Sequence, residues 1–74
     1  MEILKGKYRH FKGKEYRVLG VATHSETGVP MVVYQALYGD HLLWVRPAEM
    51  WFQAVEYHGR EIPRFTYLGE EEQG

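Results

Sequence analysis

The chain has 74 residues, a net charge of −1 at pH 7 and no cysteine. This length allows one small domain, and the lack of cysteine excludes disulfides and cysteine-ligated zinc as the means of stabilising it. Phe, Trp and Tyr make up 15% of the residues, so we expect packed aromatic rings to form the core.

The first residues hold no apolar run of the length found in signal peptides, and no stretch approaches the roughly 20 apolar residues of a membrane span. We therefore expect a soluble, cytoplasmic protein with no membrane contact. Residues 1–24 carry six Lys and Arg against two acids, whereas residues 25–74 carry three against eight. This overall charge is too low for a dedicated DNA-binding protein, which usually presents a strongly basic face.

Glycines and alternating apolar residues predict two strands at the start of the chain. The first covers residues 6–11, and the second covers residues 15–23 after a turn at 12–14. Gly20 lies inside the second strand, which indicates a bulge or a close approach of two backbones. Alternation predicts one face of this strand to consist of Tyr16, Val18, Gly20 and Ala22.

An apolar hairpin is predicted at the centre of the chain. Residues 30–38 and 42–46 form its arms, after a polar turn at 24–29. Trp44 and Arg46 share one face of the second arm, and the sequence leaves open whether that face lies against the core or toward solvent. On the first arm, one face consists of Val32, Tyr34, Ala36 and Tyr38.

The chain changes character after this hairpin. Pro47 followed by Ala-Glu-Met predicts one or two helical turns within residues 47–53. A last hairpin is expected from residues 54–57 and 61–68, and Pro63 marks its second arm as an edge strand.

The predicted fold is therefore mainly β. We expect a small, bent, SH3-like β-barrel of about five to six strands with one short helical turn, and an α+β roll is the alternative. Residues 6–68 form this single domain, between an N-terminal lead-in at 1–5 and an acidic, disordered tail at 69–74.

Four sequence blocks occur in a distinctive order: GKYRHFKG at 6–13, GVATHSET at 20–27, VVYQALYG at 32–39 and LWVRP at 43–47. These blocks resemble the signature of DUF1653, a family of short bacterial proteins of unknown function, and Pro-Arg-Phe at 63–65 also fits. The resemblance spans roughly residues 6–68. It implies a compact, β-rich, SH3-like fold, and it implies no known activity, ligand or catalytic residue.

The leading functional hypothesis is a non-catalytic module that binds a ligand or a protein partner. Small barrels often bind ligands through exposed aromatic rings and a few polar groups, and an arginine can hold a carboxylate or a phosphate with two hydrogen bonds. The expected ligand-binding surface consists of Tyr34, Trp44 and Arg46, with His24 and Glu26 at its rim.

A structural interpretation of the same residues is also open. In that case the aromatic rings form the core, and Arg46 is ion-paired with Glu26 or Glu49. We expect the protein to be a monomer or a weak homodimer, since Pro63 disfavours tight pairing at the last strand.

A second hypothesis is nucleic-acid or nucleotide binding through the N-terminal strand. Basic and aromatic residues alternate there, a pattern typical of strands on which bases stack. The rest of the chain is acidic, and it contains no RNA-binding motif. The residues concerned are Lys7, Tyr8, Arg9, Phe11 and Lys12.

A third hypothesis is an enzyme site around His24, Glu26 and Arg46. The sequence has no glycine-rich phosphate loop, nucleophile elbow or zincin helix. His24 and Ser25 are adjacent, so in an extended chain they point to opposite faces and cannot pair. The four histidines are 14, 17 and 17 residues apart, which matches no compact metal site. No metal and no cofactor are predicted.

Overall fold

The structure of the protein is a computed structural model that describes residues 3–70. It is mainly β, with one short helical turn, as the sequence predicts. The strands and the single 3₁₀ turn, η1, follow in this order: β1 (Gly6–His10), β2 (Glu15–Thr23), β3 (Pro30–Ala36), β4 (Leu43–Pro47), η1 (Ala48–Met50), β5 (Ala54–Tyr57), β6 (Arg60–Pro63) and β7 (Phe65–Gly69).

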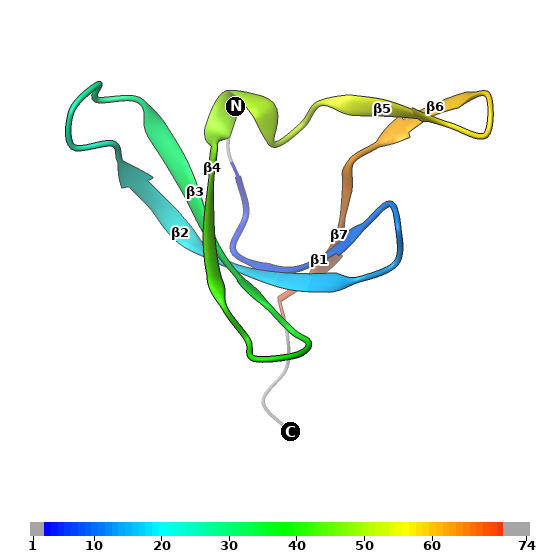
Figure 1. The fold of residues 1–74 in the computed structure, drawn as a ribbon, viewed down its shortest axis with the longest axis horizontal. Coiled ribbons are helices and arrows are strands. Elements are labelled where there is room, and N and C mark those ends of the chain that lie inside the picture. The colour runs from blue at the N-terminus through cyan, green and yellow to red at the C-terminus, as the bar shows by residue number, and fades with distance from the viewer. Residues whose placement is uncertain (1–2, 71–74) are drawn as a thin grey trace.

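Five strands form one strongly bent antiparallel sheet in the order β4-β3-β2-β1-β7, and β5 and β6 form a separate hairpin. Figure 1 shows this hairpin extending away from the bend of the larger sheet. In the described part of the chain, β4 and β7 are the two edges of the sheet and do not pair with each other. The sheet is therefore barrel-like and bent without closing into a barrel.

The bulge that Gly20 predicts is present in β2. Val18 and Gly20 lie opposite consecutive residues of β3, so Leu19 is an extra residue in the strand. An extra residue shifts the alternation of side chains by one position, and Val21 continues the face that Val18 begins. The sequence predicted that Gly20 and Ala22 continue the face of Tyr16 and Val18. That prediction is wrong beyond Val18, because the bulge places Val21 on this face instead.

The second arm of the last predicted hairpin divides in two. β6 ends at Pro63 and pairs with β5, whereas β7 begins at Phe65 and pairs with β1. Arg64 lies between them, and its backbone donates to Gln53 O at 3.1 Å and accepts from Phe11 N–H at 2.9 Å. Proline has no N–H to continue a ladder, so the chain changes its partner strand at this point.

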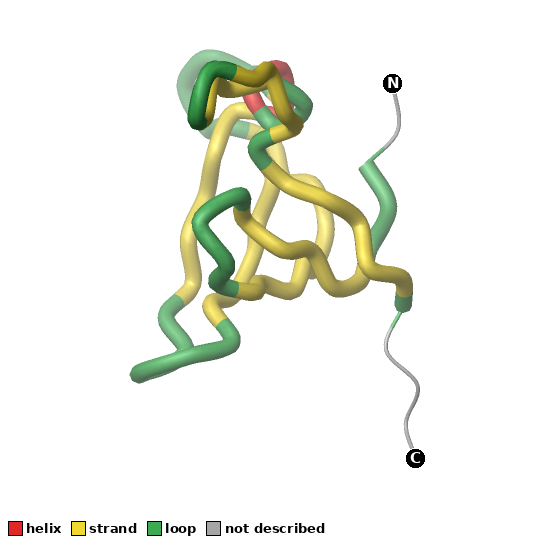
Figure 2. Tube along the Cα trace, turned by 90° about the vertical axis from the view of Figure 1, so that its right-hand side faces the viewer, coloured by secondary structure: helices red, strands yellow, loops and turns green. Residues whose placement is uncertain are grey.

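The core lies on one face of the five-stranded sheet, which we call the inner face; the opposite side is the outer face. Trp51 follows η1 and packs against the inner face, where it is only 1% exposed. Its ring stacks on Phe65 with a centroid distance of 4.0 Å and an interplanar angle of 7°. Seen from the side, the helical turn lies at one end of the sheet (Figure 2). The inner face is defined by the buried residues Tyr8, Val18, Val32 and Tyr34.

The expected domain limits fall close to the ends of the described chain. β7 continues through Gly69, so the fold extends one residue into the expected acidic tail at 69–74. Residues 71–74 of that tail, and residues 1 and 2 of the expected lead-in, lie outside the described residues.

Candidate functional site

The pairing of β3 with β4 places Trp44 and Arg46 on the inner face. Trp44 lies opposite Tyr34, and Arg46 lies opposite Val32. Directly opposed residues of an antiparallel pair project to the same side of the sheet. Tyr34 and Val32 are core residues, 5% and 0% exposed. The face of Trp44 and Arg46 that the sequence left open is therefore the inner one.

Trp44 and Tyr34 differ in accessibility although they are neighbours. Within residues 3–70 no further strand pairs with the outer side of β4, and Trp44 is 46% exposed. Tyr34 lies one strand further in, and its ring packs edge-on against Trp51 with centroids 5.0 Å apart. Of these two predicted ligand contacts, Trp44 is accessible at the surface and Tyr34 is part of the core.

Arg46 is partly buried, and its Nε is enclosed without a hydrogen-bond partner within residues 3–70. In this part of the chain the ion pairs join Lys7 and Arg9 to Glu15. The predicted pairing of Arg46 with Glu26 or Glu49 is not found among the described residues. The guanidinium thus remains without a carboxylate partner there.

Arg64 repeats this arrangement from another part of the chain. Its backbone is held between β6 and β7, and its Nε is also enclosed without a hydrogen-bond partner among the described residues. The sequence analysis did not single out Arg64 for function. Its only sequence signal is its position between Pro63 and Phe65 in the family block.

His10 connects the two arginines electrostatically. It lies opposite Phe65 in the β1–β7 pair and so projects to the inner face. Burial lowers the pKa of His10 below its ordinary value of 6.5, and the positive charges of Arg64, Lys12 and Arg46 lower this pKa further. The Nδ1 atom accepts a hydrogen bond from the backbone N–H of Lys12 at 3.2 Å. Arg46 and Arg64 thus both act on His10, and we call these three residues the cationic cluster.

Two tyrosine hydroxyls lie beside the cationic cluster. The hydroxyl groups of Tyr16 and Tyr38 are 2.8 Å apart and share a hydrogen bond. Burial and this bond raise the pKa of Tyr16 to about 12, although Arg46 acts in the opposite direction. The Lys14 ammonium lies 4.6 Å from the centre of the Tyr38 ring. The Tyr16 hydroxyl thus offers a neutral polar group, and the sequence analysis did not single out Tyr16 for function.

The basic residues of the second hypothesis do not share one surface. Lys7 and Arg9 lie on the outer face, and both form ion pairs with Glu15, at 3.6 and 3.2 Å. Tyr8 projects to the inner face and is 3% exposed. Phe11 is half-buried and Lys12 is exposed beyond the end of β1. The structure therefore separates Lys7 and Arg9 from Tyr8, whereas the Lys12 ammonium lies 5.8 Å from the centre of the Phe11 ring.

The predicted rim residues His24 and Glu26 lie in the exposed turn between β2 and β3. His24 Nδ1 accepts hydrogen bonds from the backbone N–H groups of Glu26 and Thr27, at 3.1 and 3.3 Å. This use of a polar side chain to satisfy turn backbone is common. Among the described residues, neither His24 nor Glu26 makes a hydrogen bond or an ion pair with Arg46.

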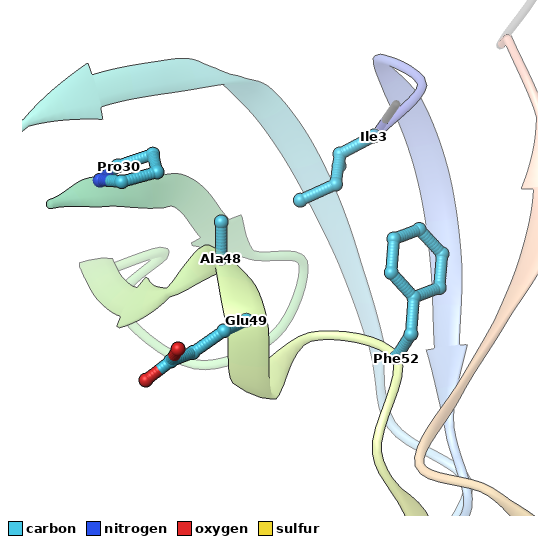
Figure 3. Close-up of a pocket in the computed structure, with 5 residues that line it drawn as sticks. All are labelled: Ile3, Pro30, Ala48, Glu49 and Phe52. Carbon is cyan, nitrogen blue, oxygen red and sulfur yellow. The ribbon is translucent and has the colours of Figure 1, made fainter. Parts of the chain in front are cut away.

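Two hollows lie near the inner face. A larger one, of about 280 Å³, is lined by Ile3, Pro30, Ala48, Glu49 and Phe52. Ile3, Ala48 and Phe52 face one another across it, and the Glu49 carboxylate points away (Figure 3). A smaller one, of about 80 Å³, lies beside Trp44. The larger hollow has apolar walls and offers no group that would hold an anion.

Residues 3–70 contain no group of three His, Asp or Glu side chains that could hold a metal ion. No helix in the same range is long and apolar enough to cross a membrane.

Comparison with known proteins identifies the family of the chain. The family model DUF1653, described as a protein of unknown function, matches residues 6–67. The chain is also similar to a crystal structure of a DUF1653 protein from Bordetella bronchiseptica, with a TM-score of 0.87 and 33% identity over 99% of this chain and 96% of that one. No curated protein matches the chain. This chain therefore belongs to the DUF1653 family.

Proposed function

We propose that the chain is a non-catalytic binding module whose inner face holds a ligand with an anionic group, a carboxylate or a phosphate, at the cationic cluster. The observation that carries this proposal is the pair of enclosed Nε atoms, on Arg46 and Arg64, without hydrogen-bond partners in the described chain. Enclosing an N–H group without a hydrogen-bond acceptor is unfavourable. A bound anion supplies both the missing acceptor and the missing counter-charge.

The distribution of charge supports the same role. Lys12 adds a third permanent positive charge near His10, and the one carboxylate that is ion-paired in the described chain, Glu15, lies on the outer face. A cluster of positive charges attracts anions. The planar guanidinium groups match the geometry of carboxylate and phosphate oxygens.

The tyrosine pair favours binding over proton transfer. With a pKa of about 12, Tyr16 keeps its proton at neutral pH. It can therefore donate or accept a hydrogen bond, but it is a poor acid or base there.

Titration calorimetry with inorganic phosphate and with acetate, at low ionic strength, tests the proposal. Arg46→Gln and Arg64→Gln should each weaken anion binding by about tenfold or more, because a hydrogen bond to a charged group contributes about 1.5–3 kcal/mol. Arg60→Gln is the matched control, since Arg60 is exposed at the start of β6 and its loss changes the net charge equally. Amide spectra confirm that each variant is folded.

Equal weakening by all three substitutions would mean that the anions respond only to net charge. That outcome, or no measurable binding by the wild-type protein, overturns the proposed function.

A further inference from the structure

Trp44 and Arg46 form a two-part surface on the inner face. They are two positions apart in β4, so their Cα atoms are about 7 Å apart at a rise of roughly 3.3–3.4 Å per residue. One is a half-exposed aromatic ring, and the other is a cation without a described partner. A ligand that uses both residues must therefore join a flat ring to an anionic group.

The hollow beside Trp44 adds a requirement on the ring. It is lined by Ala36, Tyr38, Leu42 and Trp44 together with Asp40, whose side chain is exposed. Asp40 makes no ion pair within residues 3–70. A carboxylate accepts hydrogen bonds from ring amino groups, as acidic side chains do from cytosine. The ring that fits this surface is therefore flat and carries N–H donors.

We propose that the ligand of the inner face is a nucleotide, with its base stacked on Trp44 and directed toward Asp40, and with its phosphate at Arg46 and Arg64. This inference rests on the proposed function and gives the anion its chemical class. Bases stack on aromatic side chains with little dependence on sequence, and arginine suits phosphate geometry. The nucleotide is either a free monophosphate or one unit of a single strand.

The test separates the contribution of the base to binding from the contribution of the phosphate. Binding of AMP, adenosine and inorganic phosphate is measured by calorimetry, and the Trp44 indole N–H resonance is followed by NMR. Wild-type protein should bind AMP more tightly than either part alone. Trp44→Leu should weaken AMP binding by roughly fivefold to a hundredfold, the range for loss of one stacked base, and should leave phosphate binding unchanged.

Two further variants check the assignment of each contact. Asp40→Asn should weaken AMP binding and leave phosphate binding unchanged. Phe52→Leu is the matched control, because Phe52 is also 46% exposed but lines the other hollow; it should leave both affinities unchanged. Arg46→Gln should weaken AMP and phosphate alike.

The outcomes distinguish this inference from the function on which it rests. If Arg46→Gln weakens phosphate binding but Trp44→Leu leaves AMP binding unchanged, the nucleotide is excluded and the anion-binding function stands. If Arg46→Gln weakens neither, both fail. A further measurement with hexa-adenylate distinguishes a single strand from a free monophosphate. If hexa-adenylate binds more tightly than AMP and Trp44→Leu weakens both equally, the nucleotide is one unit of a single strand. If hexa-adenylate binds equally or more weakly, the ligand is a free monophosphate.

Discussion

Arg46 lies directly opposite Val32 in the β3–β4 pair, so the one charged residue of β4 projects to the same side as the most completely buried residue of the core. Its Nε has no hydrogen-bond partner in the described chain. An enclosed N–H group without an acceptor does not stabilise the fold, because its desolvation is not offset by a hydrogen bond. We interpret Arg46 as a residue that the fold positions for a ligand.

Replacing Arg46 by Met should not destabilise the protein. Methionine keeps the aliphatic length of the side chain and removes a partly buried positive charge that acts on His10, so the free energy of unfolding should stay within about 0.5 kcal/mol of wild type or rise. Urea denaturation monitored by fluorescence measures this. A loss of more than about 2 kcal/mol would show that the guanidinium has a stabilising partner, which contradicts our interpretation.

Trp51 should be the residue on which the fold most depends. It is 1% exposed and stacks on Phe65, and truncating a buried Trp costs about 3–5 kcal/mol. A domain of this size has roughly 4–11 kcal/mol in total, so Trp51→Ala should lose a large share of the free energy of unfolding and should unfold at a much lower urea concentration than wild type, as measured by circular dichroism. Phe52→Ala changes the next residue, which is 46% exposed, and should cost about 1 kcal/mol or less. Similar losses in both variants would contradict the described core.

Stability should fall on mild acidification because of His10. Burial, followed by the charges of Arg64, Lys12 and Arg46, lowers the pKa of His10 in the folded state below the 6.5 of an unperturbed histidine. The unfolded state therefore binds the proton more readily. His10 has no effect on the free energy of unfolding well above pH 6.5, and it reduces this free energy as the pH falls through 6.5 toward the folded-state pKa.

His10→Gln should remove this part of the pH dependence. Unfolding by urea is compared at about pH 8 and about pH 5.5, a range in which carboxylates of ordinary pKa stay ionised. Wild type should lose more stability over this range than His10→Gln. Equal losses in the two proteins would mean that His10 titrates with an ordinary pKa.

Much of the fold follows from local sequence patterns. The central hairpin, the helical turn after Pro47 and the bulge near Gly20 are all predicted, because proline, glycine and strict alternation act on neighbouring residues. The change of partner after Pro63 is not predicted. β7 pairs with β1, almost sixty residues earlier in the chain, and no local pattern specifies which distant strand receives it.

The candidate site was predictable only in part, for a related reason. Alternation shows that Trp44 and Arg46 share a face, but not that β4 lies at a sheet edge and leaves Trp44 half-exposed. Arg64 and His10 join Arg46 only through the β1–β7 pairing and the division of the last hairpin arm. The sequence predicted Tyr34 and Trp44 together as ligand contacts. Tyr34 lies on β3, one strand further from the sheet edge than Trp44, and is therefore part of the core.

The most direct test of an anion at the cationic cluster is the pKa of His10, measured by NMR with and without inorganic phosphate. Because the arginine charges lower this pKa, an anion between them should raise it, while His24 in the exposed β2–β3 turn serves as the reference in the same sample. In the double variant Arg46→Gln and Arg64→Gln, the pKa of His10 should start higher and respond little to phosphate. A pKa of His10 that shifts no more than that of His24 in the wild-type protein would contradict the account.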